Sequence, residues 1–233
     1  MLADKKIKTT RSNWKFDLNV AKNFDSHVKK SVPYYDHAHE IILGLSDFFL
    51  KTNSVCYDLG CSNGSLIQKI AKRHPKKNFV LQGYDTSKHM IKIAKKNSKD
   101  KRTKFYLRDI SKLKLRKNDL TLSLFTMQFI PPKKRQKIYD NIYKSLNWGG
   151  AFVLCEKIRG NDARFQDILN FLYFDFKSKS FSSNEILNKE SSLRGIMEPF
   201  TIKSNLDYLK RAGFKDIMPI YQYLCFKGFL AIK

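Results

Sequence analysis

The stretch that decides the fold is Val55-Cys56-Tyr57-Asp58-Leu59-Gly60-Cys61-Ser62-Asn63-Gly64. A short run of strand-favouring residues ends at the acidic residue and gives way to a small turn with two glycines. Residues 65–71 then carry apolar side chains at helical spacing. Glycine permits close backbone approach, and the first turn of a helix offers free N–H groups to a polar ligand. Strand, turn and helix together predict the front of a nucleotide-binding βαβ unit.

The glycine spacing narrows the kind of site. Gly60 and Gly64 do not form the G-x-G-x-x-G pattern of dinucleotide-binding turns, and no G-x-x-x-x-G-K-[ST] pattern occurs in the chain. An ordinary NAD site and a P-loop are therefore excluded.

Three aspartates are expected at one edge of the sheet. Asp58 ends the first strand, Asp85 follows the strand-like residues 78–84, and Asp109 closes the next apolar stretch. Asp85 lies about 20 residues past the glycines, where an acidic residue accepts hydrogen bonds from ribose hydroxyls. Open α/β sheets bind ligands at the carboxyl ends of their strands. We therefore expect the three carboxylates to share one cleft.

Alternating strands and helices predict an α/β, Rossmann-like fold with a mostly parallel sheet and helices on both faces. The last two strands are close enough in sequence to form a C-terminal antiparallel hairpin. Residues 16–30 have the spacing of one helix. We expect a single domain over 1–233, divided into a basic flexible tail (1–15), N-terminal helices (16–52), a cofactor-binding core (53–157), a helical lid insertion (158–200), and a final helix with the hairpin (201–233).

The amino-acid composition and net charge bear on which partners the chain can bind. The chain has 45 Lys and Arg against 21 Asp and Glu, a net charge of +24. A lysine-rich surface can neutralise nucleic-acid phosphates, but these lysines are spread along the whole chain, which favours simple solvation. No membrane-length apolar run or secretory signal is present, so we expect a cytoplasmic protein with no membrane contact. Neither a metal nor a disulfide framework is expected from the spacing of Cys56, Cys61, Cys155 and Cys225.

The predicted core, its hairpin and the turn Asp-Leu-Gly-Cys-Ser-Asn-Gly resemble the class I S-adenosylmethionine-dependent methyltransferases. The resemblance extends to one branch, the carboxy-S-adenosyl-L-methionine synthases that serve tRNA wobble-uridine modification. It covers nearly the whole chain, and its most specific stretches are 30–35, 57–62, 125–129, 149–151, 155–157 and 212–214.

This resemblance implies S-adenosyl-L-methionine, or its carboxylated form, as the cofactor. Tyr35 would close over the methionine part, Asp85 would hold the ribose hydroxyls, and Asp109 with Ile110 would hold the adenine. Leu124 stands where the family has an asparagine. The cofactor-binding residues implied in this way are Tyr35, Asp58, Gly60, Cys61, Ser62, Asp85, Thr86, Asp109, Ile110 and Leu124.

One departure from the family bears on the reaction. Glu190 stands where the family has the arginine that grips the extra carboxylate of the cofactor. Two carboxylates in a poorly solvated site repel each other, which favours ordinary S-adenosylmethionine and methyl transfer to an unidentified small molecule. Lys189 or Arg194 could instead replace the lost cation. The candidate catalytic residues on the acceptor side are Glu190, Tyr173, Asp175 and Glu156.

Three alternatives stay open. The chain could be a carboxy-S-adenosyl-L-methionine synthase that has moved its cation and uses prephenate as the carboxyl source. It could also be an RNA-binding or RNA-modifying protein that uses its positive surface, or a catalytically silent cofactor-binding subunit. The resemblance further implies a homodimer.

Overall fold

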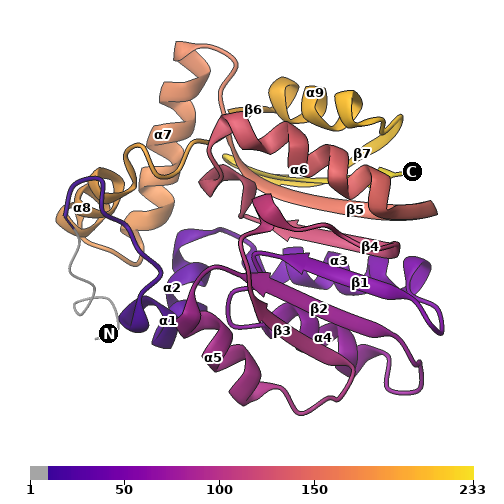
Figure 1. Ribbon diagram of the computed structural model, residues 1–233. Helices are drawn as coiled ribbons and strands as arrows, with labels where there is room; N and C mark the ends of the chain where they lie inside the picture. Colours follow the sequence, from indigo (N-terminus) through magenta and orange to yellow (C-terminus); the bar gives the residue numbers. More distant parts are fainter. Residues whose placement is uncertain (1–9) are drawn as a thin grey trace.

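The computed structural model describes residues 10–233 (Figure 1). The sheet has the strand order β3-β2-β1-β4-β5-β8-β7, and the short β6 pairs with β5. The first five strands are parallel, whereas β8 runs antiparallel to both β5 and β7. The predicted Rossmann-like sheet and its closing hairpin are confirmed. The strands are β1 (Val55–Leu59), β2 (Val80–Asp85), β3 (Thr103–Leu107), β4 (Asn118–Leu124), β5 (Leu146–Arg159), β6 (Phe200–Thr201), β7 (Asp216–Tyr223) and β8 (Phe226–Ile232).

Helices cover both faces of this sheet because its buried strands are apolar on both sides. In β1, Cys56 belongs to one apolar layer and Tyr57 to the other. The first layer includes side chains of α3 (Tyr35–Phe49), α4 (Ser65–Arg73) and α5 (Lys88–Asn97). The second includes side chains of α6 (Pro132–Ser145) and α9 (Ile202–Ala212).

The helix predicted over residues 16–30 is two helices. They are α1 (Leu18–Lys22), which is capped by the Asp17 carboxylate, and α2 (Phe24–Ser31). The break falls at Asn23, whose φ of −108° and ψ of 10° lie outside the helical range. The prediction of one continuous helix was wrong because apolar spacing alone does not detect such a break.

The flexible tail predicted over 1–15 also differs from the structure in its described part. Ser12 N donates to Ser191 O at 3.0 Å, and Trp14 N donates to Ser192 O at 3.1 Å. The Trp14 side chain is only 7% exposed. Residues from 10 onward are therefore fastened to the helical insertion, while 1–9 lie outside the described residues.

The helical insertion consists of α7 (Ala163–Ser178) and α8 (Ser183–Leu193). Figure 1 shows α1, α2, α7 and α8 gathered beyond the carboxyl ends of the parallel strands. Two short 3₁₀ turns, η2 (Ile110–Lys112) and η3 (Met127–Phe129), follow β3 and β4 at the same edge. This edge is therefore enclosed by helices.

Within residues 10–233, no helix is long and apolar enough to cross a membrane, and no cluster of His, Cys, Asp or Glu side chains could hold a metal ion. All four cysteines are buried and free.

Candidate active site

A cavity of about 890 Å³ lies at the carboxyl ends of β1, β2 and β4. Its walls come from the turn after β1, from these strand ends, and from α2, α7 and α8. The structure brings together every predicted cofactor-binding residue except Asp109. Those that line the cavity are Tyr35, Asp58, Gly60, Cys61, Ser62, Asp85, Thr86, Ile110 and Leu124.

The turn after β1 forms one wall through its backbone. Gly60 N and Cys61 N both donate to Tyr84 O, at 2.8 and 3.0 Å, which ties the turn to the end of β2. Gly60 has a φ of +89°, and a Cβ at this position would collide with the Thr126 side chain. A larger residue is therefore excluded both by backbone conformation and by space.

Two buried carboxylates lie beside this turn. Asp85 accepts hydrogen bonds from Ser62 N at 3.0 Å and from Ser87 N at 2.8 Å, one on each oxygen. Each oxygen has a second acceptor site, as two ribose hydroxyls require. Burial, together with the neighbouring charge of Asp85, raises the pKa of Asp58 to about 7. The donor set and the glycine cradle fit an adenosyl ligand.

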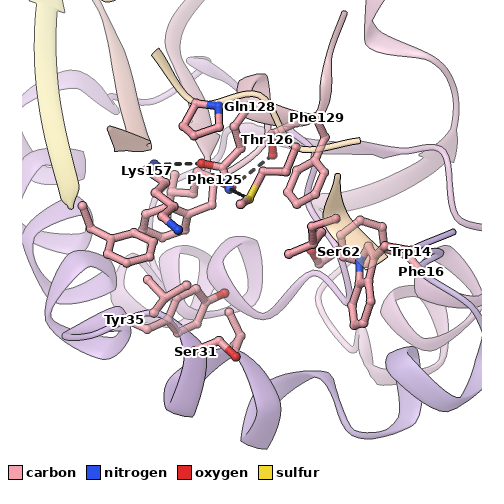
Figure 2. A pocket seen from close by; sticks show the side chains of 18 of the residues that line it. Trp14, Phe16, Ser31, Tyr35, Ser62, Phe125, Thr126, Gln128, Phe129 and Lys157 are labelled. Carbon is pink, nitrogen blue, oxygen red and sulfur yellow. Dashed lines mark hydrogen bonds between the residues drawn. The ribbon is translucent and has the colours of Figure 1, made fainter. Parts of the chain in front are cut away.

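Aromatic side chains close the cavity on two sides. Tyr35, at the start of α3, lies 4.4 Å from the His39 ring and 6.1 Å from the Phe125 ring, centroid to centroid. Trp14 and Phe16 lie across the cavity from it, and the Phe16 ring makes an edge contact with Phe129 at 5.4 Å (Figure 2). The walls therefore offer flat apolar surfaces to a ligand with an aromatic part.

Charged side chains gather at the other end of the cavity. Lys177 Nζ lies 2.6 Å from Glu190 Oε1, and both residues line the cavity. The ammonium groups of Lys157 and Lys177 lie 4.3 and 4.4 Å from the centroid of the Tyr173 ring. Tyr173 is held in place because its hydroxyl donates to Ser31 O at 2.7 Å. This end can therefore receive a charged group.

Comparison with known proteins agrees with this geometry. A model of a methyltransferase domain family matches residues 56–150. Carboxy-S-adenosyl-L-methionine synthases from Staphylococcus epidermidis and Campylobacter lari are each 35% identical to the chain. These alignments cover 94% and 97% of this chain, respectively, and 97% of each relative. The chain belongs to the carboxy-S-adenosyl-L-methionine synthase family.

Solved structures of methyltransferases share the fold of this synthase family member. Human N-acetylserotonin methyltransferase in complex with S-adenosylmethionine aligns with a TM-score of 0.65 at 16% identity, covering 93% of this chain and 55% of that chain. The S-adenosylmethionine-dependent methyltransferase SibL in its apo form aligns with a TM-score of 0.64 at 13% identity, and the alignment covers 99% of this chain and 64% of that chain. The predicted resemblance to class I methyltransferases is confirmed, and the chain is a transferase of that S-adenosylmethionine-dependent class.

The two cations considered as replacements for the family's arginine both line the cavity. The Lys189 ammonium lies over the Trp14 ring and 3.3 Å from His27 Nε2, so it fastens the N-terminal segment to α8. Arg194 is exposed at the end of α8. Among the described cations that line the cavity, Lys157 and Lys177 are the two that lie against Tyr173.

Three predicted site residues do not line the cavity. Glu156 is buried behind it, where its carboxylate accepts from Met127 N at 3.0 Å and fixes η3. Asp175 is exposed, because two helical positions after Tyr173 a side chain points to nearly the opposite face. Asp109 turns back to accept from Ser111 N at 2.8 Å and caps η2. Glu156 therefore has a structural role. Of the three aspartates expected in one cleft, Asp58 and Asp85 line it.

Trp14, Phe16 and Lys157 line the cavity, although none of them is predicted as a site residue from the sequence. Trp14 is a detectable signal, since a bulky apolar side chain is uncommon in a solvated basic tail, and Phe16 begins the apolar spacing of residues 16–30. Lys157 gave no signal, because it is one of 45 Lys and Arg residues and only the packing of α7 encloses it.

Proposed function

We propose that this chain binds S-adenosylmethionine across the carboxyl edge of the sheet and converts it to carboxy-S-adenosyl-L-methionine. Following the family resemblance, prephenate is the source of the carboxyl group: it would lose CO2 and its hydroxyl group and become phenylpyruvate. The methyl carbon of S-adenosylmethionine would lose a proton and form the new bond to that CO2, and the proton and hydroxide would leave as water. The observation that carries the proposal is the Lys177–Glu190 ion pair, with its 2.6 Å separation. Because Lys177 compensates the charge of Glu190, the exchange of arginine for glutamate leaves no uncompensated anion at this end of the cavity.

The adenosyl half of the cavity supports binding of this cofactor. Asp85 has free acceptor sites for the ribose, and the Gly60 turn lets the backbone approach the amino-acid part. When bound, S-adenosylmethionine supplies a methyl carbon activated by a sulfonium. The protein's part is to orient that carbon, to exclude water with the aromatic walls, and to balance the charge of the incoming group.

The opposite half of the cavity supports an acidic reaction partner. Lys157 and Lys177 line it beside the Glu190 carboxylate that pairs with Lys177. A carboxylate entering a site with a cationic surplus is attracted, and the attraction is stronger where water is excluded. Prephenate and the carboxylated product both carry such a group.

Methyl transfer to a small-molecule acceptor is the second candidate. It is favoured by Glu190 itself, which stands in the position of the arginine and is 51% exposed at the side chain. A carboxylate there could steady a cationic amine or accept its proton. We rank it second because the Glu190 carboxylate already accepts a hydrogen bond from the Lys177 ammonium and is engaged within the protein.

Mass spectrometry of the ligand that survives purification tests this ranking. The proposal expects carboxy-S-adenosyl-L-methionine to co-purify with the protein. Plain S-adenosylmethionine or its demethylated product as the sole ligand would favour the methyltransferase candidate. Substitution of Asp85 by alanine is the control, since it should abolish retention of either ligand.

We also propose, from the family resemblance, that the chain is a cytoplasmic homodimer that supplies tRNA wobble-uridine modification. Light scattering on the purified protein tests the dimer. Wobble-uridine analysis of tRNA from cells lacking the protein tests its pathway.

A further inference from the structure

Lys157 occupies a defined position at the end of the cavity where Lys177 pairs with Glu190. It lies at the carboxyl end of β5, where its backbone N–H donates to Gln128 Oε1 at 2.7 Å and its strand pairs with β8 opposite Phe226. Figure 2 shows its side chain on the same side of the cavity as Tyr35 and away from Trp14. Two strands and a side-chain hydrogen bond therefore hold this lysine in place.

In the part of the chain that the structure describes, the Lys157 ammonium makes no salt bridge to a protein carboxylate, and the charge of Glu190 acts on it only from a greater distance. The ammonium lies 4.3 Å from the centroid of the neutral Tyr173 ring, and the Lys177 ammonium lies 4.4 Å from the same centroid. Within residues 10–233, the ion pair at this end of the cavity joins Lys177 to Glu190 and leaves Lys157 out. The Tyr173 hydroxyl is also committed, because it donates to Ser31 O.

The local charges do not sum to zero. Lys157 and Lys177 contribute two positive charges and Glu190 one negative charge, which leaves one positive charge beside an aromatic wall. Enclosing an ammonium is unfavourable, and burial, with the nearby charge of Lys177, lowers the pKa of Lys157. A ligand that brings one negative charge to this position would remove the imbalance.

We propose that Lys157 is the residue that recognises the ligand's carboxylate in this chain, in place of the arginine that Glu190 has replaced. The ligand class is a sulfonium compound with a carboxylate on the transferred carbon. This inference rests on the proposed function and adds a specificity-determining residue to it. Lysine offers a point charge where arginine offers a planar fork, so the carboxylate is held by one strong charge-assisted hydrogen bond.

Binding measurements on ligand-stripped protein test this role. Isothermal titration with carboxy-S-adenosyl-L-methionine and with S-adenosylmethionine gives the preference of each variant for the carboxylated ligand. Lys157→Gln should weaken binding of the carboxylated ligand about 10- to 100-fold and change binding of S-adenosylmethionine less than about threefold. Lys157→Arg should keep most of the preference. Arg159→Gln removes an exposed cation from the same cavity and is the matched control. It should also keep the preference for the carboxylated ligand.

The outcomes separate this inference from the proposed function. Equal weakening of both ligands by Lys157→Gln, no weakening of either, or a wild-type protein without preference would overturn the role of Lys157. Retained binding of S-adenosylmethionine shows that the variant is folded. A wild-type protein that prefers the carboxylated ligand through Lys157 but makes none from S-adenosylmethionine and prephenate would overturn the synthase function alone.

Discussion

The ammonium of Lys177 lies 2.6 Å from Oε1 of Glu190, and this pair joins α7 to α8 across one end of the cavity. The lysine side chain is 7% exposed and the glutamate side chain 51%, so the cation is on the buried side. Glu190 therefore acts as a counter-ion within the protein, whereas an arginine at the same position would face Lys177 with a like charge.

Glu190→Gln should increase the preference for the carboxylated ligand about 3- to 10-fold, because it frees Lys177 to interact with that carboxylate. Competition binding at fixed ionic strength measures the effect. Glu198→Gln is the control, since Glu198 also lines the cavity but has no ion pair with Lys177. If Glu190 serves a methyl acceptor instead, Glu190→Gln will abolish methyl transfer and leave the ligand preference unchanged.

Asp85→Ala should reduce the affinity for S-adenosylmethionine about 100-fold or more. The variant removes the acceptor for the ribose and also leaves the N–H groups of Ser62 and Ser87 without their partner. Isothermal titration measures the loss. Asp109→Ala is the matched comparison, because the Asp109 carboxylate caps η2 outside the cavity, and its variant should bind within about threefold of the wild type. An Asp109→Ala variant that loses as much affinity as Asp85→Ala would contradict this assignment.

The buried carboxyl group of Glu156 should make the stability of the fold depend on pH. Burial raises its pKa to about 8 from an ordinary value of 4.5, so between these values the folded state holds a proton that the unfolded state has released. The contribution of Glu156 to the free energy of unfolding is therefore fully present below pH 4.5. It decreases as the pH rises from 4.5 toward 8, by up to about 1.4 kcal/mol per pH unit.

Glu156→Gln mimics the protonated form and should become more stable relative to the wild type as pH rises from 5 to 8, with no further gain above that range. Chemical unfolding at several pH values measures this difference. Glu156→Ala should destabilise the protein at every pH, because it leaves Met127 N without an acceptor. A difference between wild type and Glu156→Gln that does not change with pH would refute the raised pKa.

Trp14 should control how fast the cofactor leaves. Its ring lies at the cavity wall and stacks on His27 at 6.0 Å, so truncation opens a path to solvent. Trp14→Ala is expected to raise the dissociation rate of S-adenosylmethionine about tenfold or more in stopped-flow measurements. Trp148→Ala is the control, because that side chain is 88% exposed on β5. Equal rates in the two variants would argue against a closing role for the N-terminal segment.

The parts of the site that the sequence predicted are those set by local structure. Gly60 and Asp85 follow strands directly, and a strand–turn–helix unit places them at the ligand edge whatever the rest of the chain does. Asp109 also follows a strand directly, but its carboxylate caps η2, and the residue of this turn that lines the cavity is its neighbour Ile110.

The parts that the sequence missed depend on packing between distant segments. Lys157 becomes enclosed because Tyr173 of α7 covers the end of β5. Trp14 is buried because its backbone bonds to Ser192 and its side chain packs with Val20 and Met90. Glu190 was read as an uncompensated anion because its partner, Lys177, is on another helix. Pairing across elements is not visible in residue spacing along one element.

The most direct test of the account is the product formed by the purified chain from S-adenosylmethionine and prephenate, identified by mass spectrometry. The account predicts carboxy-S-adenosyl-L-methionine, formed by the wild type and reduced strongly in Lys157→Gln. Unchanged S-adenosylmethionine in the presence of prephenate, with the cofactor shown to be bound, would contradict it.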